Sequence, residues 1–159
     1  MENQQNINLH NNADLIYEYT KERIKDINDG INRKINALAG TLAFCGATLK
    51  FTNDIPVNGY YFSARVLICF FLLIAMGSCV AGLQRMKTDN IFGPKDLLKP
   101  EIYRATGEEC KITIIQNLID FIPSLQKVSK RRGDCLMVAF RSLTAAIVVI
   151  CITIAASQT

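Results

Sequence analysis

Few residues in this chain could do chemistry, and their spacing matches no catalytic arrangement. The lone histidine, His10, lies in a polar stretch rich in asparagine and glutamine, where we expect a solvated side chain rather than a base or a metal ligand. Glu108 and Glu109 are adjacent, but a helix dipole favours such a pair in a first turn without any acid–base role. The sequence has no phosphate-binding glycine loop and no protease or hydrolase motif. We therefore expect a non-enzymatic protein without a cofactor.

The six cysteines are the second candidate for chemistry. No two of them form a CxxC pair, so neither a zinc ribbon nor a thioredoxin-like site is indicated. Most lie in apolar runs, where a thiol behaves as a small hydrophobic side chain. We expect reduced, structural cysteines and no metal site at Cys45, Cys69, Cys79, Cys110, Cys135 and Cys151.

The positive charge is modest, at +4, and no dense basic face with interleaved aromatic residues is present. We therefore expect no nucleic-acid partner. The densest basic run, Lys130, Arg131 and Arg132, directly precedes an apolar segment. Such a run is expected to fix the orientation of a membrane span and to meet anionic lipid headgroups. A nucleotide or another phosphate ligand at this run is an alternative that the sequence leaves open.

The element that organises the chain is the apolar run 66–83, which contains no charge and no proline. A helix of this length crosses most of a hydrocarbon core of about 30 Å. A buried helix of a soluble domain is the alternative, but such helices are usually shorter and keep a polar stripe. We interpret residues 65–84 as a membrane span, with further spans at 35–51 and 135–156.

Small residues recur at four-residue spacing on two of these spans. In lipid, helices associate where small side chains let their backbones approach closely. An alanine-rich helix without a packing role is the alternative for 35–51. We predict helix packing, with a partner inside the chain or in another copy, at Ala39, Ala43, Ala47, Ser78 and Gly82.

The segments outside the spans are polar or amphipathic. Residues 1–12 are polar and predicted to be disordered. Residues 13–34 predict a helix, because isoleucines and leucines recur at spacings of three and four opposite a charged face. Residues 85–134 predict a connector and, from about residue 101, a second amphipathic helix that Pro123 should kink. The short segments 52–64 and 157–159 are predicted to be a loop and a tail on the other side of the membrane.

Lysine and arginine concentrate in 1–34 and 84–134. The positive-inside rule therefore places both regions in the cytoplasm of a multi-pass inner-membrane protein. For Arg141, an anchor that reaches back to the headgroups is favoured over a residue that lines an ion path. The predicted interface anchors are Arg33, Lys34, Arg65, Lys130, Arg131, Arg132 and Arg141.

The sequence thus predicts an all-α fold. Three transmembrane helices, a hairpin plus a C-terminal span, are joined to long amphipathic cytoplasmic helices that form a bundle. The lipid bilayer is the expected partner, together with another copy of the chain or a different membrane protein.

A charged helix over 22–27 leads through 32–40 into a small-residue span, and a basic run leads into the last span. In this layout the chain resembles the small bacterial membrane proteins of the SLATT and Pycsar-effector type. The resemblance implies an oligomerising, membrane-perturbing effector of a bacterial defence or stress system. The alternative is a membrane anchor or accessory subunit that docks a partner through residues 101–132.

Overall fold

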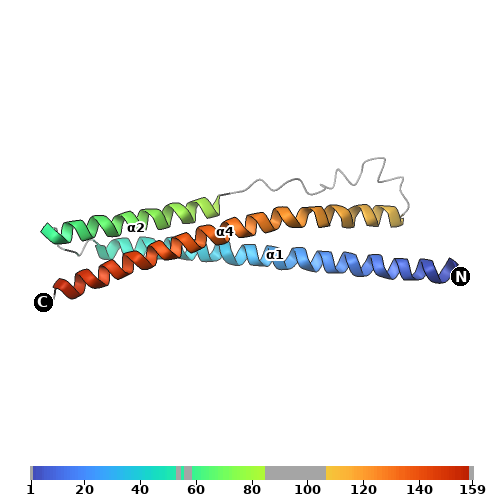
Figure 1. The fold of residues 1–159 in the computed structure, drawn as a ribbon, viewed down its shortest axis with the longest axis horizontal. Coiled ribbons are helices and arrows are strands. Elements are labelled where there is room, and N and C mark those ends of the chain that lie inside the picture. The colour runs from blue at the N-terminus through green and yellow to red at the C-terminus, as the bar shows by residue number, and fades with distance from the viewer. Residues whose placement is uncertain (1, 53–54, 56–58, 85–106, 158–159) are drawn as a thin grey trace. The chain divides into compact units, whose positions relative to one another are not determined.

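The computed structural model describes residues 2–52, 55, 59–84 and 107–157. Over these residues the protein is helical and has no strand, so the predicted all-α class is confirmed. The helices are α1 (Glu2–Thr52), α2 (Gly59–Leu83) and α4 (Gly107–Ser157) (Figure 1). The predicted connector before residue 101, the first residues of the predicted helix up to 106, residues 53, 54 and 56–58 of the predicted loop, Met1 and the last two residues lie outside the described residues.

The helices are longer than the sequence predicts. Helix α1 begins at Glu2, so it includes residues 2–12, where the polar composition predicts no ordered structure. No glycine or proline occurs before Gly30, so nothing in this stretch interrupts a helix. Helix α4 likewise runs without a break through Pro123 and joins the predicted cytoplasmic helix to the predicted last span.

Helix α2 begins earlier than predicted, at Gly59 rather than at residue 65. Gly59 has a φ of +39°, a left-handed conformation that a residue without a Cβ adopts at little cost. The helix therefore includes Tyr61, whose hydroxyl donates a hydrogen bond to the carbonyl oxygen of Ala156 at 3.4 Å. The start of α2 is thereby tied to the end of α4.

The chain divides into two compact units. Unit 1 comprises residues 1–30 and 86–129, and unit 2 comprises residues 31–85 and 130–159. In unit 1, α1 and α4 are linked by an ion pair between Asp14 and Lys111. Buried side chains there include Thr20 on α1 and Ile115, Leu125 and Val128 on α4.

In unit 2, all three helices contribute to one buried interior. One cluster joins Cys45 of α1 to Ile68, Leu72 and Ala75 of α2 and to Leu143 and Ala146 of α4. A second cluster joins Leu38, Cys79 and Ala139. From the second cluster to the first, the residue numbers rise on α1 and on α4 but fall on α2. In this unit α1 and α4 therefore run parallel to each other, and α2 runs antiparallel to both.

The buried positions of unit 2 follow a seven-residue repeat. On α1 they alternate at spacings of three and four, and on α2 at four and three. Helices that pack with this repeat wind around each other at a shallow angle, as in coiled coils. The buried positions are Leu38, Thr41, Cys45, Thr48 and Thr52 on α1, and Ile68, Leu72, Ala75, Cys79 and Gly82 on α2.

Candidate functional site

The described residues bring together no group that could bind a metal. Within them, no cluster of three or more histidine, cysteine or acidic side chains could hold a metal ion. The six cysteines are free thiols, and Cys45 and Cys79 are packed in the interior of unit 2. The features that carry functional information are therefore the surface of unit 2 and the charges at its ends.

Two described helices are long and apolar enough to cross a membrane. They are Tyr61–Leu83, with a mean hydropathy of 2.6, and Glu109–Ala156, whose most apolar window has a mean hydropathy of 2.4. Only 28% and 17% of these windows are buried within the protein, unlike the core helix of a soluble domain. The spans predicted at 65–84 and 135–156 lie in these two helices, whereas the span predicted at 35–51 stays a prediction.

The outer surface of unit 2 is strongly apolar. On α2 the side chains of Phe62, Phe70 and Leu73 are 55%, 57% and 64% exposed. On α4 the side chains of Phe140 and Ile152 are 50% and 57% exposed. Exposed apolar surface of this extent is typical of a site of contact with lipid or with another protein.

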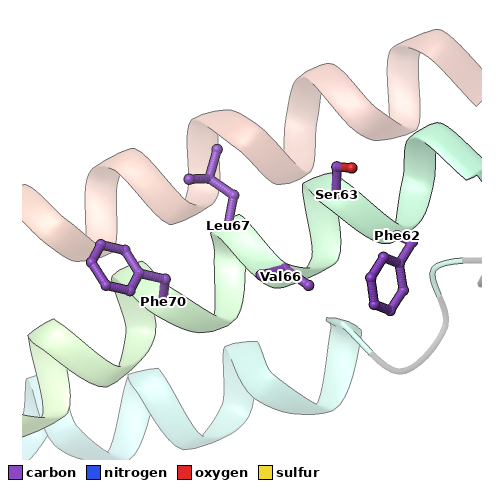
Figure 2. Close-up of a pocket in the computed structure, with 5 residues that line it drawn as sticks. All are labelled: Phe62, Ser63, Val66, Leu67 and Phe70. Carbon is purple, nitrogen blue, oxygen red and sulfur yellow. The ribbon is translucent and has the colours of Figure 1, made fainter.

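Part of this surface forms a shallow hollow of about 370 Å³ (Figure 2). Its lining side chains all project from the outer face of α2, and the one polar group among them is the hydroxyl of Ser63. Ligand sites instead gather several polar groups from different elements. The hollow is therefore a groove in the apolar surface rather than a candidate ligand site; its lining residues are Phe62, Ser63, Val66, Leu67 and Phe70.

The interior of unit 2, in contrast, contains hydroxyl groups. Thr41 and Thr48 on α1 and Thr153 on α4 are 4–6% exposed. Each hydroxyl donates to the carbonyl oxygen four residues earlier, at 2.7, 2.8 and 2.7 Å respectively. These buried hydroxyls are therefore satisfied within their own helices and need no partner across the interface.

The predicted packing residues separate into two groups. Gly82 lies in the interior, where an added Cβ would come within 2.8 Å of Leu38 Cδ1 and 3.0 Å of Cys135 Cβ. Ser78 beside it is half-buried. The three predicted packing alanines of α1, Ala39, Ala43 and Ala47, are instead exposed on the surface of unit 2.

The predicted anchors also differ in position. Arg33, Lys130 and Arg131 are exposed near the end of unit 2 where residue 31 enters it. Arg65 is half-buried at the opposite end, and Arg141 is exposed on the outer face of α4. Lys34 and Arg132 are half-buried between helices, an arrangement that the basic runs alone did not indicate.

The surroundings of these half-buried cations are defined by one close approach and one buried nitrogen atom. The Nζ atom of Lys34 lies 3.6 Å from the position that a Cβ of Gly133 would take. The lysine side chain of α1 therefore lies against the backbone of α4, next to Arg132. The Nε atom of Arg132 is buried and, among the described residues, has no hydrogen-bond partner.

Comparison with models of protein families, with curated proteins and with solved structures finds no match for this chain. The resemblance to SLATT-type proteins therefore stays a prediction. A functional conclusion has to rest on the surface, the interior and the charges of the protein itself.

Proposed function

We propose that this chain is a non-enzymatic integral membrane protein whose unit 2 lies in the bilayer and self-associates there. The observation that carries the proposal is the inverted distribution of polarity in unit 2. Large apolar side chains cover its exterior, while threonine hydroxyls bonded to their own helices lie inside. Moving a large apolar side chain out of water is worth about 1.5–3 kcal/mol, so such an exterior favours lipid strongly.

The proposal includes a third span at 35–51. Although α1 is less apolar than the other two helices, its buried face runs from Leu38 to Thr52 in the shared interior of unit 2. Its threonines Thr41 and Thr48 face that interior, whereas Phe44 and Phe51 are 56% and 66% exposed. The exposed polar side chains Asn36 and Lys50 lie near the two ends of the segment. A mean hydropathy counts a polar residue equally whether it faces the interior or the lipid. The threonines that face the interior therefore lower the mean hydropathy of this segment relative to that of α2.

The charges at the ends of unit 2 support an orientation. Arg33, Lys34 and the run Lys130–Arg132 lie near one end, whereas Lys50 and Arg65 lie near the other. Under the positive-inside rule the more basic end faces the cytoplasm, so the N-terminal part of α1 would also be cytoplasmic. This is the orientation expected of a multi-pass protein of a bacterial inner membrane.

Self-association is supported by the face of α1 that unit 2 leaves exposed. Ala39, Ala43 and Ala47 lie on this face, and a Cβ added to Gly40 or Gly46 would meet nothing within 4 Å. A second helix could approach this face closely in lipid. An oligomer assembled in this way would be suited to perturbing a membrane, which is the activity that the resemblance to SLATT-type effectors implies.

The experiment is cross-linking of the full chain in native membranes. We expect dimers or larger species for the parent protein and their loss in Ala43→Leu, because three added carbons prevent close backbone approach. Ala155→Leu is the matched control, since Ala155 is an exposed alanine of α4. Monomer alone across a range of expression levels would refute self-association, and so would equal loss in both variants.

A second function is favoured by a separate observation in unit 1. Leu15 and Tyr19 on α1 and Ile112 on α4 are 64%, 70% and 51% exposed there. An apolar surface on a water-facing unit suits the docking of a partner, so the chain would serve as a membrane anchor or accessory subunit acting through residues 101–132.

A further inference from the structure

Five large apolar side chains are exposed on unit 1, and we call this set the unit 1 patch. Each of them is 46–70% exposed. The proposed placement of unit 2 in the bilayer leaves unit 1 in water, so lipid does not cover the patch. Its members are Leu15, Ile16 and Tyr19 on α1 and Ile112 and Ile119 on α4.

The unit 1 patch lies on one side of the pair of helices. In unit 1 an ion pair links α1 to α4, and the two helices run in the same direction (Figure 1). Ile16 directly precedes the half-buried Tyr17 on α1, and Ile119 directly follows the half-buried Leu118 on α4. In a parallel pair of helices with a seven-residue repeat, these two positions flank the same side of the seam. Ile112 lies one repeat before Ile119 and therefore on that side as well.

On α1, the patch continues the small-residue face that unit 2 leaves exposed. Helix α1 is unbroken over Glu2–Thr52, and its buried positions keep the seven-residue repeat in both units. Leu15 precedes Ala43 by 28 residues, which is four repeats, and Tyr19 precedes Ala47 by the same interval. Each pair therefore occupies the same place in the repeat. A helix that packs along α1 with this repeat and reaches Ala43 and Ala47 also meets Leu15 and Tyr19.

We propose that the unit 1 patch packs against the unit 1 patch of a second copy of this chain. This inference rests on the proposed self-association of unit 2. Two copies in one membrane have the same orientation, so their α1 helices run parallel and their two units 1 lie on the same side of the bilayer. The patch can then meet itself about a two-fold axis, as surfaces do in most homodimers.

The size of the patch favours a second copy over a soluble partner. Five partly exposed side chains present on the order of a few hundred Å² of apolar surface. Each partner in a stable complex of freely diffusing proteins buries about 800 Å². A copy that is already held in the same membrane needs less surface, because its effective concentration beside the patch is high. The patch therefore suits the extension of an interface that unit 2 begins.

The first test places the photoreactive residue p-benzoylphenylalanine at Tyr19 of the full chain and irradiates native membranes. We expect a covalent dimer of the chain, because Tyr19 is the most exposed member of the patch. The matched control has the same photoreactive residue at Lys21. Lys21 is also exposed on α1, but residues two apart on a helix do not share a face, so this variant should form no covalent dimer.

The second test uses the purified full chain in phosphatidylcholine vesicles, where fluorescence energy transfer between labelled copies reports dimers as the protein-to-lipid ratio rises. Ile119→Ser should raise the ratio needed for half-maximal transfer about tenfold, because both copies lose apolar surface. Asp120→Ser is the matched control, since Asp120 is an exposed polar neighbour outside the patch. It should change that ratio by less than about threefold.

The outcomes separate this contact from the self-association of unit 2. An adduct of the Tyr19 variant with a different protein or with lipid, equal dimer yields from the Tyr19 and Lys21 variants, or an unchanged ratio for Ile119→Ser would each overturn the proposal. If chemical cross-linking gives dimers that Ala43→Leu abolishes, but the Tyr19 variant gives no covalent dimer, only the contact of unit 1 fails. If chemical cross-linking shows monomer alone, the self-association of unit 2 fails and this contact fails with it.

Discussion

Gly82 shows how a single residue sets the packing of unit 2. The Cβ of an alanine here would come within 2.8 Å of a methyl carbon of Leu38, which is fully buried and has little room to move. Overpacking of this kind costs about 1–3 kcal/mol, which outweighs the gain of up to about 1 kcal/mol in helix propensity. We expect Gly82→Ala to lower the unfolding midpoint of the purified protein.

The matched control for Gly82 is Gly77 on the same helix. An added Cβ at Gly77 meets nothing within 4 Å. Gly77→Ala should therefore leave the midpoint unchanged or raise it. If both variants behave alike in the same melting experiment, the close approach of α1 and α2 at Gly82 is wrong.

The residue type of Arg141 alone does not determine which face of its helix it occupies. The sequence favoured an anchor over a residue that lines an ion path, and the structure places Arg141 on the outer face of α4 rather than in the interior of unit 2. It lies six residues after Cys135, which corresponds to about 9 Å of helix rise. Because helical side chains point toward the N-terminus of their helix, the guanidinium can extend toward the basic end of α4.

At the scale of the elements, composition and periodicity predicted the helices but not their faces. The apolar run 66–83 is long enough to identify α2 on its own. On α1 the sequence predicted one face of isoleucines and leucines, whereas the most buried positions after Leu38 are Thr41, Cys45 and Thr48. The seven-residue spacing of these positions was the available signal, and it was obscured because threonines rank as polar.

The same limit applies to two of the predicted anchors. Lys34 and Arg132 were both predicted as anchors, since each belongs to a basic run beside an apolar segment. The position of Lys34 beside Arg132 depends on the register of α1 against α4. That register is set by packing between two helices that are far apart in the sequence. The role of Gly133, whose backbone lies against Lys34, has no local sequence signal for the same reason.

The apolar surface of unit 1 supports a prediction about a partner. If the chain acts as an anchor, Ile16→Ser and Ile112→Ser should each reduce co-purification of a stoichiometric partner from native membranes, because both side chains are about half exposed. Asn28→Ser, at an exposed polar position of unit 1, should retain the partner. Purification of the parent chain without any stoichiometric partner would count against this second function.

At the scale of the whole molecule, the chain separates a charged unit from an apolar one. On α1, the stretch that belongs to unit 1 exposes charged side chains such as Glu18, Lys21 and Arg23. Unit 2 exposes mainly phenylalanine, leucine, isoleucine and valine. The exterior becomes mainly apolar beyond the exposed Arg33 on α1 and the exposed Asp134 on α4, as the proposed placement of unit 2 in lipid requires.

Extraction of membranes with alkaline sodium carbonate tests the placement of unit 2 in the bilayer most directly. This treatment releases proteins that are held at a membrane by charge and leaves those whose apolar surface lies in the hydrocarbon core. We predict that the full chain stays in the membrane pellet after carbonate and is released only by detergent. Recovery of folded, monodisperse protein in the carbonate supernatant would contradict the account.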